Sequence, residues 1–185
     1  LPVESSRTSL TVMPWDYLVI TASNETQAAA YRDRLTLRHE LSLLSRVRRV
    51  LVLADPGGRR IGSGASTALC LMEVLHREVP PARLGASQAW HQALRRLRVL
   101  VVHAGGDSRR LPAYGPCGKI FIPVPGQGDS AIATTLFDRQ LPLYLDLPPA
   151  SEGGQVVLAA GDVLLLFDPK AVCLDAPGVI GLGSP

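Results

Sequence analysis

The sequence predicts an α/β fold built on an open, mostly parallel and doubly wound sheet. Two observations support this prediction. Short apolar runs without polar alternation recur along the chain, which is typical of parallel strands covered on both faces. Amphipathic segments of helical length separate these runs, and strands that alternate with helices indicate βαβ units.

Five apolar runs are candidate strands: residues 17–21, 50–54, 99–103, 156–160 and 163–167. The first four are predicted to be buried strands of one parallel sheet. The fifth follows the fourth so closely that a strand, the start of a helix and an irregular segment all remain open for it.

Amphipathic segments between the strands predict three helices. The first begins near Asn24, which has capping-box spacing to Gln27, and runs as far as Leu44. The third covers about residues 87–98, and three arginines near its C-terminus complement the helix dipole, namely Arg95, Arg96 and Arg98.

A glycine-rich segment, Gly62-Ser63-Gly64, leads into the second predicted helix. This helix is expected to follow Gly64, with Ser66 or Thr67 as its cap, and to stop before Pro80. A glycine-rich turn at a helix N-terminus is a natural anion site. It lacks the Gly-Lys-Ser/Thr ending of a phosphate-binding P-loop and is not a full G-x-G-x-x-G. A plain connection and a nucleotide-binding loop therefore both remain open.

The bulk composition excludes several classes of protein. A length of 185 residues with 46% hydrophobic and 19% charged residues suits one globular domain, or a piece of a larger one, and argues against disorder. No apolar run reaches the roughly 18 residues that span a bilayer, so no membrane is expected. The three cysteines, Cys70, Cys117 and Cys173, are far apart and odd in number, which predicts a reducing cytoplasm.

The charge is uneven along the chain. Residues 1–110 hold 16 Lys/Arg against 9 Asp/Glu, and residues 111–185 hold 3 against 7. A basic half indicates either an anionic partner or a solvated face of arginines. The arginines are scattered and lack the interleaved aromatic residues of a nucleic-acid surface. The solvated face is therefore favoured, and no nucleic acid is expected as a partner.

The loop after residues 99–103 carries the strongest functional signal. Ligands of open α/β sheets bind beyond the carboxyl ends of the strands. Gly105 and Gly106 let the backbone approach a ligand closely, and Ser108 and Arg109 add donors that suit phosphate oxygens. Lys119 follows ten residues later. Nucleotidyl transfer needs cations that neutralise developing charge, and this loop would supply them. A structural or solvent-facing turn is the alternative, and the spacing to Lys119 with the apolar run after it favours the functional interpretation.

Gly161-Asp162 follows the fourth candidate strand. A carboxylate at a strand end beside a triphosphate is a suitable Mg²⁺ ligand. An aspartate that makes a turn or caps a helix is the alternative.

Several of these motifs together resemble a known family. Residues 104–112, then Gly118-Lys119, then residues 135–138 resemble the sugar-1-phosphate nucleotidyltransferase pattern. More closely, residues 15–25, 55–64, 103–111 and 158–169 are similar, in this order, to the pyrophosphorylase domain of bifunctional L-fucokinase/GDP-fucose pyrophosphorylase enzymes. The similarity covers about residues 15–170. One departure is Gly118, which stands where the broader pattern has proline.

The resemblance implies a Rossmann-like nucleotidyltransferase fold that transfers GMP from GTP to fucose 1-phosphate with Mg²⁺. It implies that Lys119 and Arg109 act in catalysis and that Asp162 binds the metal. The residues it assigns to nucleotide binding are Gly62, Ser63, Gly64, Gly105, Gly106 and Ser108. Which of the two glycine loops holds the triphosphate stays open.

The resemblance also bears on domain organisation. Residues 1–185 are expected to be a partial pyrophosphorylase domain with an incomplete sheet, because the family's sugar-binding portion and C-terminal sugar-kinase domain have no counterpart in this chain. Two other functions stay open. One is a segment associated with L-fucokinase activity. The other is a non-catalytic domain that binds nucleotides or nucleic acid, which the basic first half would suit.

Overall fold

The computed structural model describes residues 13–80, 87–106, 118–125, 131–151, 153–176, 178–181 and 183. These residues form a four-stranded sheet in the order β2-β1-β3-β4, and every pair is parallel. The strands are β1 (Trp15–Ala22), β2 (Val47–Ala54), β3 (Arg98–His103) and β4 (Gln155–Ala160). The first four candidate strands are thus confirmed as strands, and each begins one to three residues before its apolar run. The expected burial is wrong for β4, where Val156 and Leu158 are 39% and 54% exposed.

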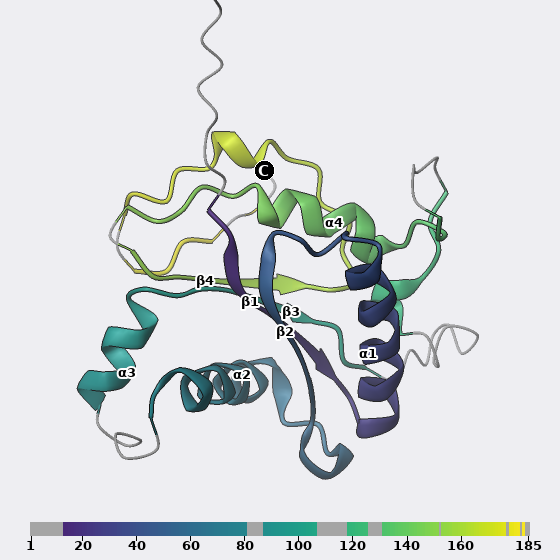
Figure 1. Ribbon diagram of the computed structural model, residues 1–185, viewed down its shortest axis with the longest axis horizontal. Coiled ribbons are helices and arrows are strands. Elements are labelled where there is room, and N and C mark those ends of the chain that lie inside the picture. Colours follow the sequence, from purple (N-terminus) through teal and green to yellow (C-terminus); the bar gives the residue numbers. More distant parts are fainter. Residues whose placement is uncertain are drawn as a thin grey trace, which may run out of the picture.

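Helices cover both faces of the sheet, as a doubly wound fold requires (Figure 1). Two apolar clusters separate the faces: one packs under α1 (Glu25–Glu40) and α4 (Leu136–Leu145), the other under α2 (Gly62–Glu78) and α3 (Ser87–Leu94). Alternate residues of β1 serve the two clusters. Leu18 belongs to the first and Val19 to the second, and both are fully buried. This two-sided burial explains the runs without polar alternation.

The strand order creates a switch point at the centre of the sheet. From β1 the chain passes through α1 to β2 on one side, and then through α2 and α3 to β3 on the other side of β1. Ligands of open α/β sheets bind at the carboxyl ends of the two strands that flank such a point. The loops after β1 and β3 are therefore the expected walls of a binding site.

The first helix starts as predicted and ends earlier than predicted. The Asn24 side chain accepts a hydrogen bond of 2.9 Å from the backbone N–H of Gln27, which confirms the cap. The helix stops at Glu40 instead of Leu44. Ser42 takes a positive φ of 59°, and the chain leaves the helix at this residue.

The second and third helices differ from the prediction at their ends. α2 begins at Gly62, so Ser66 and Thr67 lie inside the helix and neither is its cap. The Thr67 hydroxyl donates to the carbonyl of Ser63 four residues before it, a bond made inside helices. α3 ends at Leu94, because Arg98 pairs in the sheet as the first residue of β3.

Two segments near the C-terminus complete the comparison with the sequence. Residues 163–167 form neither a strand nor a helix, and Leu166 is 88% exposed. Of the three alternatives for this run, the irregular segment is thus confirmed. Conversely, α4 had not been predicted, although Thr135 and Asp138 form a complete capping box at its start. Three short 3-10 turns also occur: η1 (Pro56–Gly58), η4 (Lys119–Phe121) and η5 (Pro169–Ala171).

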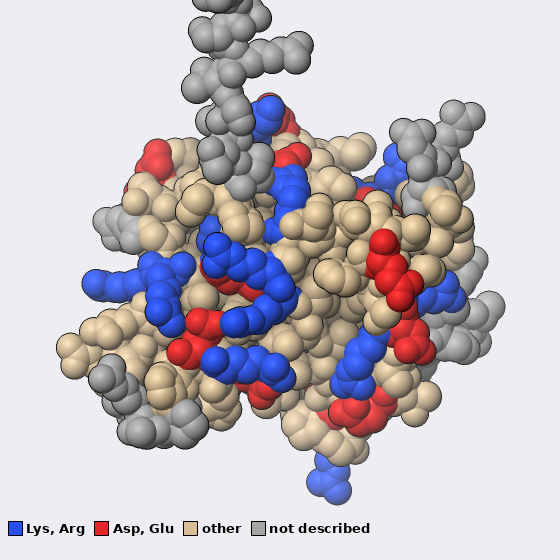
Figure 2. All heavy atoms as spheres, viewed as in Figure 1, with Lys and Arg blue, Asp and Glu red and all other residues tan. Residues whose placement is uncertain are grey.

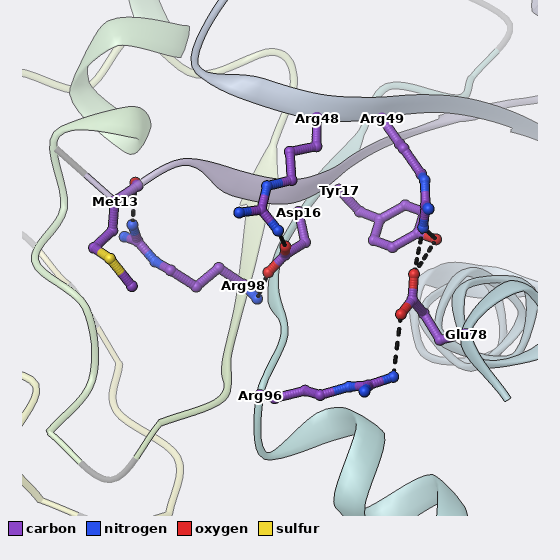
Figure 3. Close-up of polar contacts among 8 residues, drawn as sticks. All are labelled: Met13, Asp16, Tyr17, Arg48, Arg49, Glu78, Arg96 and Arg98. Atoms are coloured by element: carbon purple, nitrogen blue, oxygen red, sulfur yellow. Dashed lines mark hydrogen bonds and ion pairs between the residues drawn. The ribbon is translucent and has the colours of Figure 1, made fainter.

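The amino ends of the strands carry a network of ion pairs (Figure 3). Glu78 accepts from Arg49 and Arg96, and Asp16 accepts from Arg48. Figure 2 shows the same pattern on the surface, where basic and acidic side chains lie side by side. These three arginines are exposed and paired with carboxylates, whereas Arg38 and Arg98 of the same basic half are buried, so a solvated face accounts for only part of it. Within the described ranges, no helix combines the length and the apolar character needed to cross a membrane.

Candidate functional site

The loop after β3 lies against the carboxyl end of β1. The Thr21 hydroxyl accepts hydrogen bonds from the backbone N–H groups of Ala104, at 3.1 Å, and Gly105, at 3.4 Å. A Cβ atom added to Gly105 would lie 3.4 Å from the backbone of Ala22. The first glycine of the pair is therefore in close contact with the neighbouring strand, at the switch point of the sheet.

The loop between β2 and α2 lies beside the same point. The backbone N–H of Asp55 donates to the carbonyl of Ala22 at 2.8 Å. The Arg60 guanidinium lies 3.8 Å from where a Cβ of Gly106 would be, and the Gln27 amide donates to the Gly106 carbonyl at 3.4 Å. The structure thus brings Gly105-Gly106 next to the segment that leads into Gly62-Ser63-Gly64.

Gly118 fixes the backbone that presents Lys119. It has φ +66°, and an added Cβ would lie 1.9 Å from the hydroxyl oxygen of Tyr31. That hydroxyl donates to the carbonyl of Ala104 at 3.0 Å, so the tyrosine joins this segment to the loop after β3. Proline, which requires φ near −65°, does not fit here. This is the physical reason for the departure from the broader nucleotidyltransferase pattern.

Lys119 and Asp162 form an ion pair at the carboxyl edge. The ammonium nitrogen lies 2.9 Å from the Asp162 carboxylate, and the two side chains are 40% and 51% exposed. Gly161 holds this turn in place because its N–H donates to the carbonyl of His103 at 2.9 Å. A cation and a carboxylate thus share the solvent side of the β3 and β4 ends.

All but two of the site residues predicted from sequence lie in the part of the chain that the structure describes. Gly62, Ser63 and Gly64 form the first turn of α2, Gly105 and Gly106 lie at the switch point, and Lys119 pairs with Asp162. Ser108 and Arg109 lie outside the described residues. The ligand roles assigned to all of them stay predictions.

The metal prediction rests on Asp162. The part of the chain that the structure describes has no group of three or more His, Cys, Asp or Glu side chains that could hold a metal. Mg²⁺ does not need such a group, since it is usually bound by one or two carboxylates together with substrate phosphates. An exposed carboxylate at a strand end fits this kind of site.

The structure shows a row of polar side chains under the start of α2, and sequence reasoning did not predict that its members lie together. His103 Nε2 lies 2.9 Å from the Thr67 hydroxyl oxygen. Because this hydroxyl gives its proton to Ser63, Nε2 must donate, which fixes the imidazole tautomer. Burial lowers the pKa of His103, although the charge of Asp55 acts in the opposite direction.

Asp55 belongs to the same row; sequence reasoning assigned it no role, although it begins the segment 55–64 that resembles the family. Burial raises the pKa of its carboxyl, and the charges of Arg60 and His103 oppose that rise. A polar residue directly after a buried strand was the available signal. Its importance depends on the strand order, which places the end of β2 beside the switch point.

The fucose pyrophosphorylase domain model matches residues 91–185, just over half of the chain. The chain belongs to this family. The matched part of this fucose pyrophosphorylase domain contains both glycines of the β3 loop, Lys119 and Asp162.

Curated relatives extend the similarity to the first part of the chain. A fucose-1-phosphate guanylyltransferase from Mus musculus is 32% identical over 173 residues, which are 92% of this chain and 27% of the mouse protein. A bifunctional fucokinase/GDP-fucose pyrophosphorylase from Arabidopsis thaliana is 32% identical over 183 residues, 91% of this chain and 17% of that protein. An L-fucokinase/L-fucose-1-P guanylyltransferase from Bacteroides fragilis is 34% identical over 149 residues, 78% and 15% of the two chains.

This chain therefore spans about a quarter or less of the length of these relatives. No solved structure matches it.

Proposed function

We propose that this chain carries the transfer site of a fucose-1-phosphate guanylyltransferase. In the proposed reaction GTP and L-fucose 1-phosphate give GDP-fucose and pyrophosphate. The observation that carries the proposal is the Lys119–Asp162 pair, which lies at the carboxyl edge of the sheet beside the Gly105-Gly106 loop. The names of the mouse and human relatives, both fucose-1-phosphate guanylyltransferases, support the same activity.

The chemistry is a displacement at the α-phosphorus of GTP. An oxygen of the sugar phosphate forms the new bond to this phosphorus, and the bond to the oxygen that bridges the α- and β-phosphates breaks. The electron pair leaves with pyrophosphate. The attacking phosphate oxygen is already ionised near neutral pH, so no general base is required. Positioning and charge neutralisation then supply most of the rate.

Among the described residues, Lys119 is the one we assign to charge neutralisation. Its ammonium group is partly exposed at the strand ends, where negative charge on the departing pyrophosphate can reach it. Gly118 and the buried Ile120 on either side fix the position of its backbone. Arg109, which lies outside the described residues, is proposed as a second cation.

Two glycine-rich places would bind the nucleotide. Gly105 and Gly106 would let the phosphates approach the backbone closely at the switch point, and Ser108 would add a hydroxyl. Gly62, Ser63 and Gly64 form the first turn of α2, where backbone N–H groups have no partner within the helix. Arg60, two residues before Gly62, lies next to Gly106, which supports the proposal that the two places are walls of one site.

Asp162 would hold Mg²⁺. When bound, the ion neutralises phosphate charge and orients the oxygens around the α-phosphorus. Lys119, as its ion-pair partner, keeps the carboxylate at the edge of the sheet where the phosphates are expected. The pair therefore combines a residue for the metal with a residue for the phosphate charge.

The setting of the reaction is also a proposal. Two relatives carry fucokinase in their names, which supports a full-length protein with a sugar-kinase domain beside this one. Cys70 and Cys173 are free thiols, which supports a reducing compartment such as the cytoplasm.

Product analysis tests the proposed function. The chain is incubated with GTP, fucose 1-phosphate and Mg²⁺, and pyrophosphate, ADP and GDP-fucose are quantified. Pyrophosphate and GDP-fucose are expected in equal amounts, and only when both substrates are present. ADP formed from ATP and fucose would instead favour a kinase segment. Binding that does not discriminate GTP from a short oligonucleotide and weakens steeply with salt would favour a nucleic-acid domain.

A further inference from the structure

The end of β2 holds a carboxylate without a hydrogen-bond donor. Asp55 is half-buried, and none of the residues that the structure describes donates a hydrogen bond to its carboxylate oxygens. Arg60 and His103 act on it only through their charge. A partly buried carboxylate without donors is unfavourable, so this position is suited to donors from a ligand.

The Asp55 side chain faces α2. Leu51 and Leu53, at alternate positions before it, pack against the apolar cluster under α2 and α3. Burial raises the pKa of the Cys70 thiol of α2 to about 11, and the negative charge of Asp55 adds to that rise. The carboxylate therefore lies on the side of the sheet from which the first turn of α2, at Gly62, approaches the edge.

Asp55 lies at one end of the carboxyl edge of the sheet, and the proposed phosphate-binding residues Lys119 and Asp162 lie at the other. It follows β2, and Asp162 follows β4, so β1 and β3 stand between them. Strands are about 4.8 Å apart, which separates the two carboxylates by about 14 Å. One metal ion cannot bridge that distance. An extended nucleotide can, with its phosphates at Lys119 and Asp162 and its base at Asp55.

The chemistry of Asp55 distinguishes between bases. Guanine presents two adjacent donors, the N1–H and the exocyclic N2 amine, and an ionised carboxylate has two acceptors and no donor. Adenine presents a lone pair at N1, which a carboxylate repels. The planar Arg60 guanidinium near Asp55 is of the kind that stacks on nucleobases.

From these observations we infer that Asp55 reads the guanine base of GTP by accepting its N1 and N2 hydrogens. The inference rests on the proposed function, because it assumes that the nucleotide lies along this edge. It also assigns the two glycine loops: Gly105-Gly106 takes the triphosphate, and the first turn of α2 supports the base and ribose.

The test compares four nucleotides with wild type and Asp55→Asn by calorimetry in the presence of Mg²⁺. Inosine triphosphate lacks the N2 amine, and one hydrogen bond to a charged group is worth about 1.5–3 kcal/mol, so wild type should bind it about 10- to 100-fold more weakly than GTP. ATP should bind more weakly still. The asparagine amide offers one acceptor and one donor, which suits the N1–H and the C2 carbonyl of xanthine. Asp55→Asn should therefore prefer xanthosine triphosphate to GTP.

Matched controls keep the outcomes separate. Asp33→Asn, a change at an exposed position of α1, should leave all four affinities unchanged, and thermal unfolding checks that each variant is folded. Equal affinities of wild type for GTP and inosine triphosphate, or an equal loss for every nucleotide in Asp55→Asn, would overturn the inference and leave the proposed function standing. Failure of wild type to bind any nucleotide would overturn the proposed function itself.

Discussion

Lys119 donates a hydrogen bond of 2.9 Å to Asp162, 43 positions further along the chain. The lysine begins η4, and the aspartate lies in the turn after β4. The close approach of Gly161 to the Ile120 side chain brings these elements together, and the Gly161 N–H bond to His103 fixes the turn to the end of β3. The exposed charged pair thus depends on buried neighbours that hold η4 against the turn after β4.

Gly118→Ala should destabilise the protein strongly. A side chain at positive φ costs about 1–2 kcal/mol, and overpacking against the buried Tyr31 ring costs about 1–3 kcal/mol more. Chemical denaturation should show a loss of about 2–5 kcal/mol. Gly64→Ala is the control, because its Cβ meets nothing within 4 Å and alanine favours a helix. A Gly118→Ala protein as stable as wild type would contradict the account of how Lys119 is positioned.

Asp138 should make stability depend on acidic pH. Burial raises the pKa of its carboxyl, but the hydrogen bonds from Arg38 and Thr135 outweigh burial and hold the pKa below its usual range. A lowered carboxyl pKa stabilises the fold above the ordinary value of about 3.9 and loses that contribution as pH falls through the folded-state value. Unfolding free energies measured below pH 4 should therefore fall less steeply in Asp138→Asn.

At neutral pH the same substitution should cost about 3–5 kcal/mol, since it leaves the buried Arg38 without its carboxylate. Asp146→Asn is the matched control. Its partner Arg46 is partly exposed, and such pairs are worth about 1 kcal/mol or less. Equal losses in the two variants would show that the Arg38 pair does not hold α1 to α4.

The strands could be predicted from sequence because each is an apolar run without polar alternation, although β4 is exposed on one face, where Leu158 is 54% exposed. The proximity of Asp55 to His103 could not be predicted, because it depends on the strand order β2-β1-β3-β4, which no local pattern encodes. The partners Lys119 and Asp162 were each singled out, but their pairing depends on the β3–β4 register. The extra helix α4 contains Pro142, which reads as a helix breaker, although its capping box was visible.

Replacement of Gln140 by an apolar residue should stabilise the protein. It is buried, and neither its amide nitrogen nor its oxygen has a hydrogen-bond partner among the described residues. Such a group costs about 1–3 kcal/mol, so Gln140→Leu should raise the unfolding free energy. Gln155→Leu is the contrast, because the Gln155 amide accepts from Arg98 and donates to Pro148. If Gln140→Leu loses as much stability as Gln155→Leu, the Gln140 amide has a partner, such as a buried water.

Asp162→Asn should change the dependence on Mg²⁺. Mutation of a residue that hydrogen-bonds to a metal ligand typically lowers metal affinity by about 10- to 100-fold. Loss of the proposed ligand itself should raise the Mg²⁺ concentration for half-maximal transfer by at least about tenfold. Asp33→Asn should leave it unchanged. A slower reaction with an unaltered Mg²⁺ requirement would assign Asp162 to the positioning of Lys119 and remove it from the metal site.

The most direct measurement of the central claim compares the two lysines of the chain, Lys119 and Lys170. Pyrophosphate release from GTP and fucose 1-phosphate is measured for wild type, Lys119→Ala and Lys170→Ala, with unfolding curves for each. Removal of a group that stabilises transition-state charge lowers kcat by about 10²- to 10³-fold. Lys119→Ala should show this loss in a folded protein, and Lys170→Ala, at an exposed position in η5, should match wild type. Turnover by Lys119→Ala at the wild-type rate would contradict the proposed site.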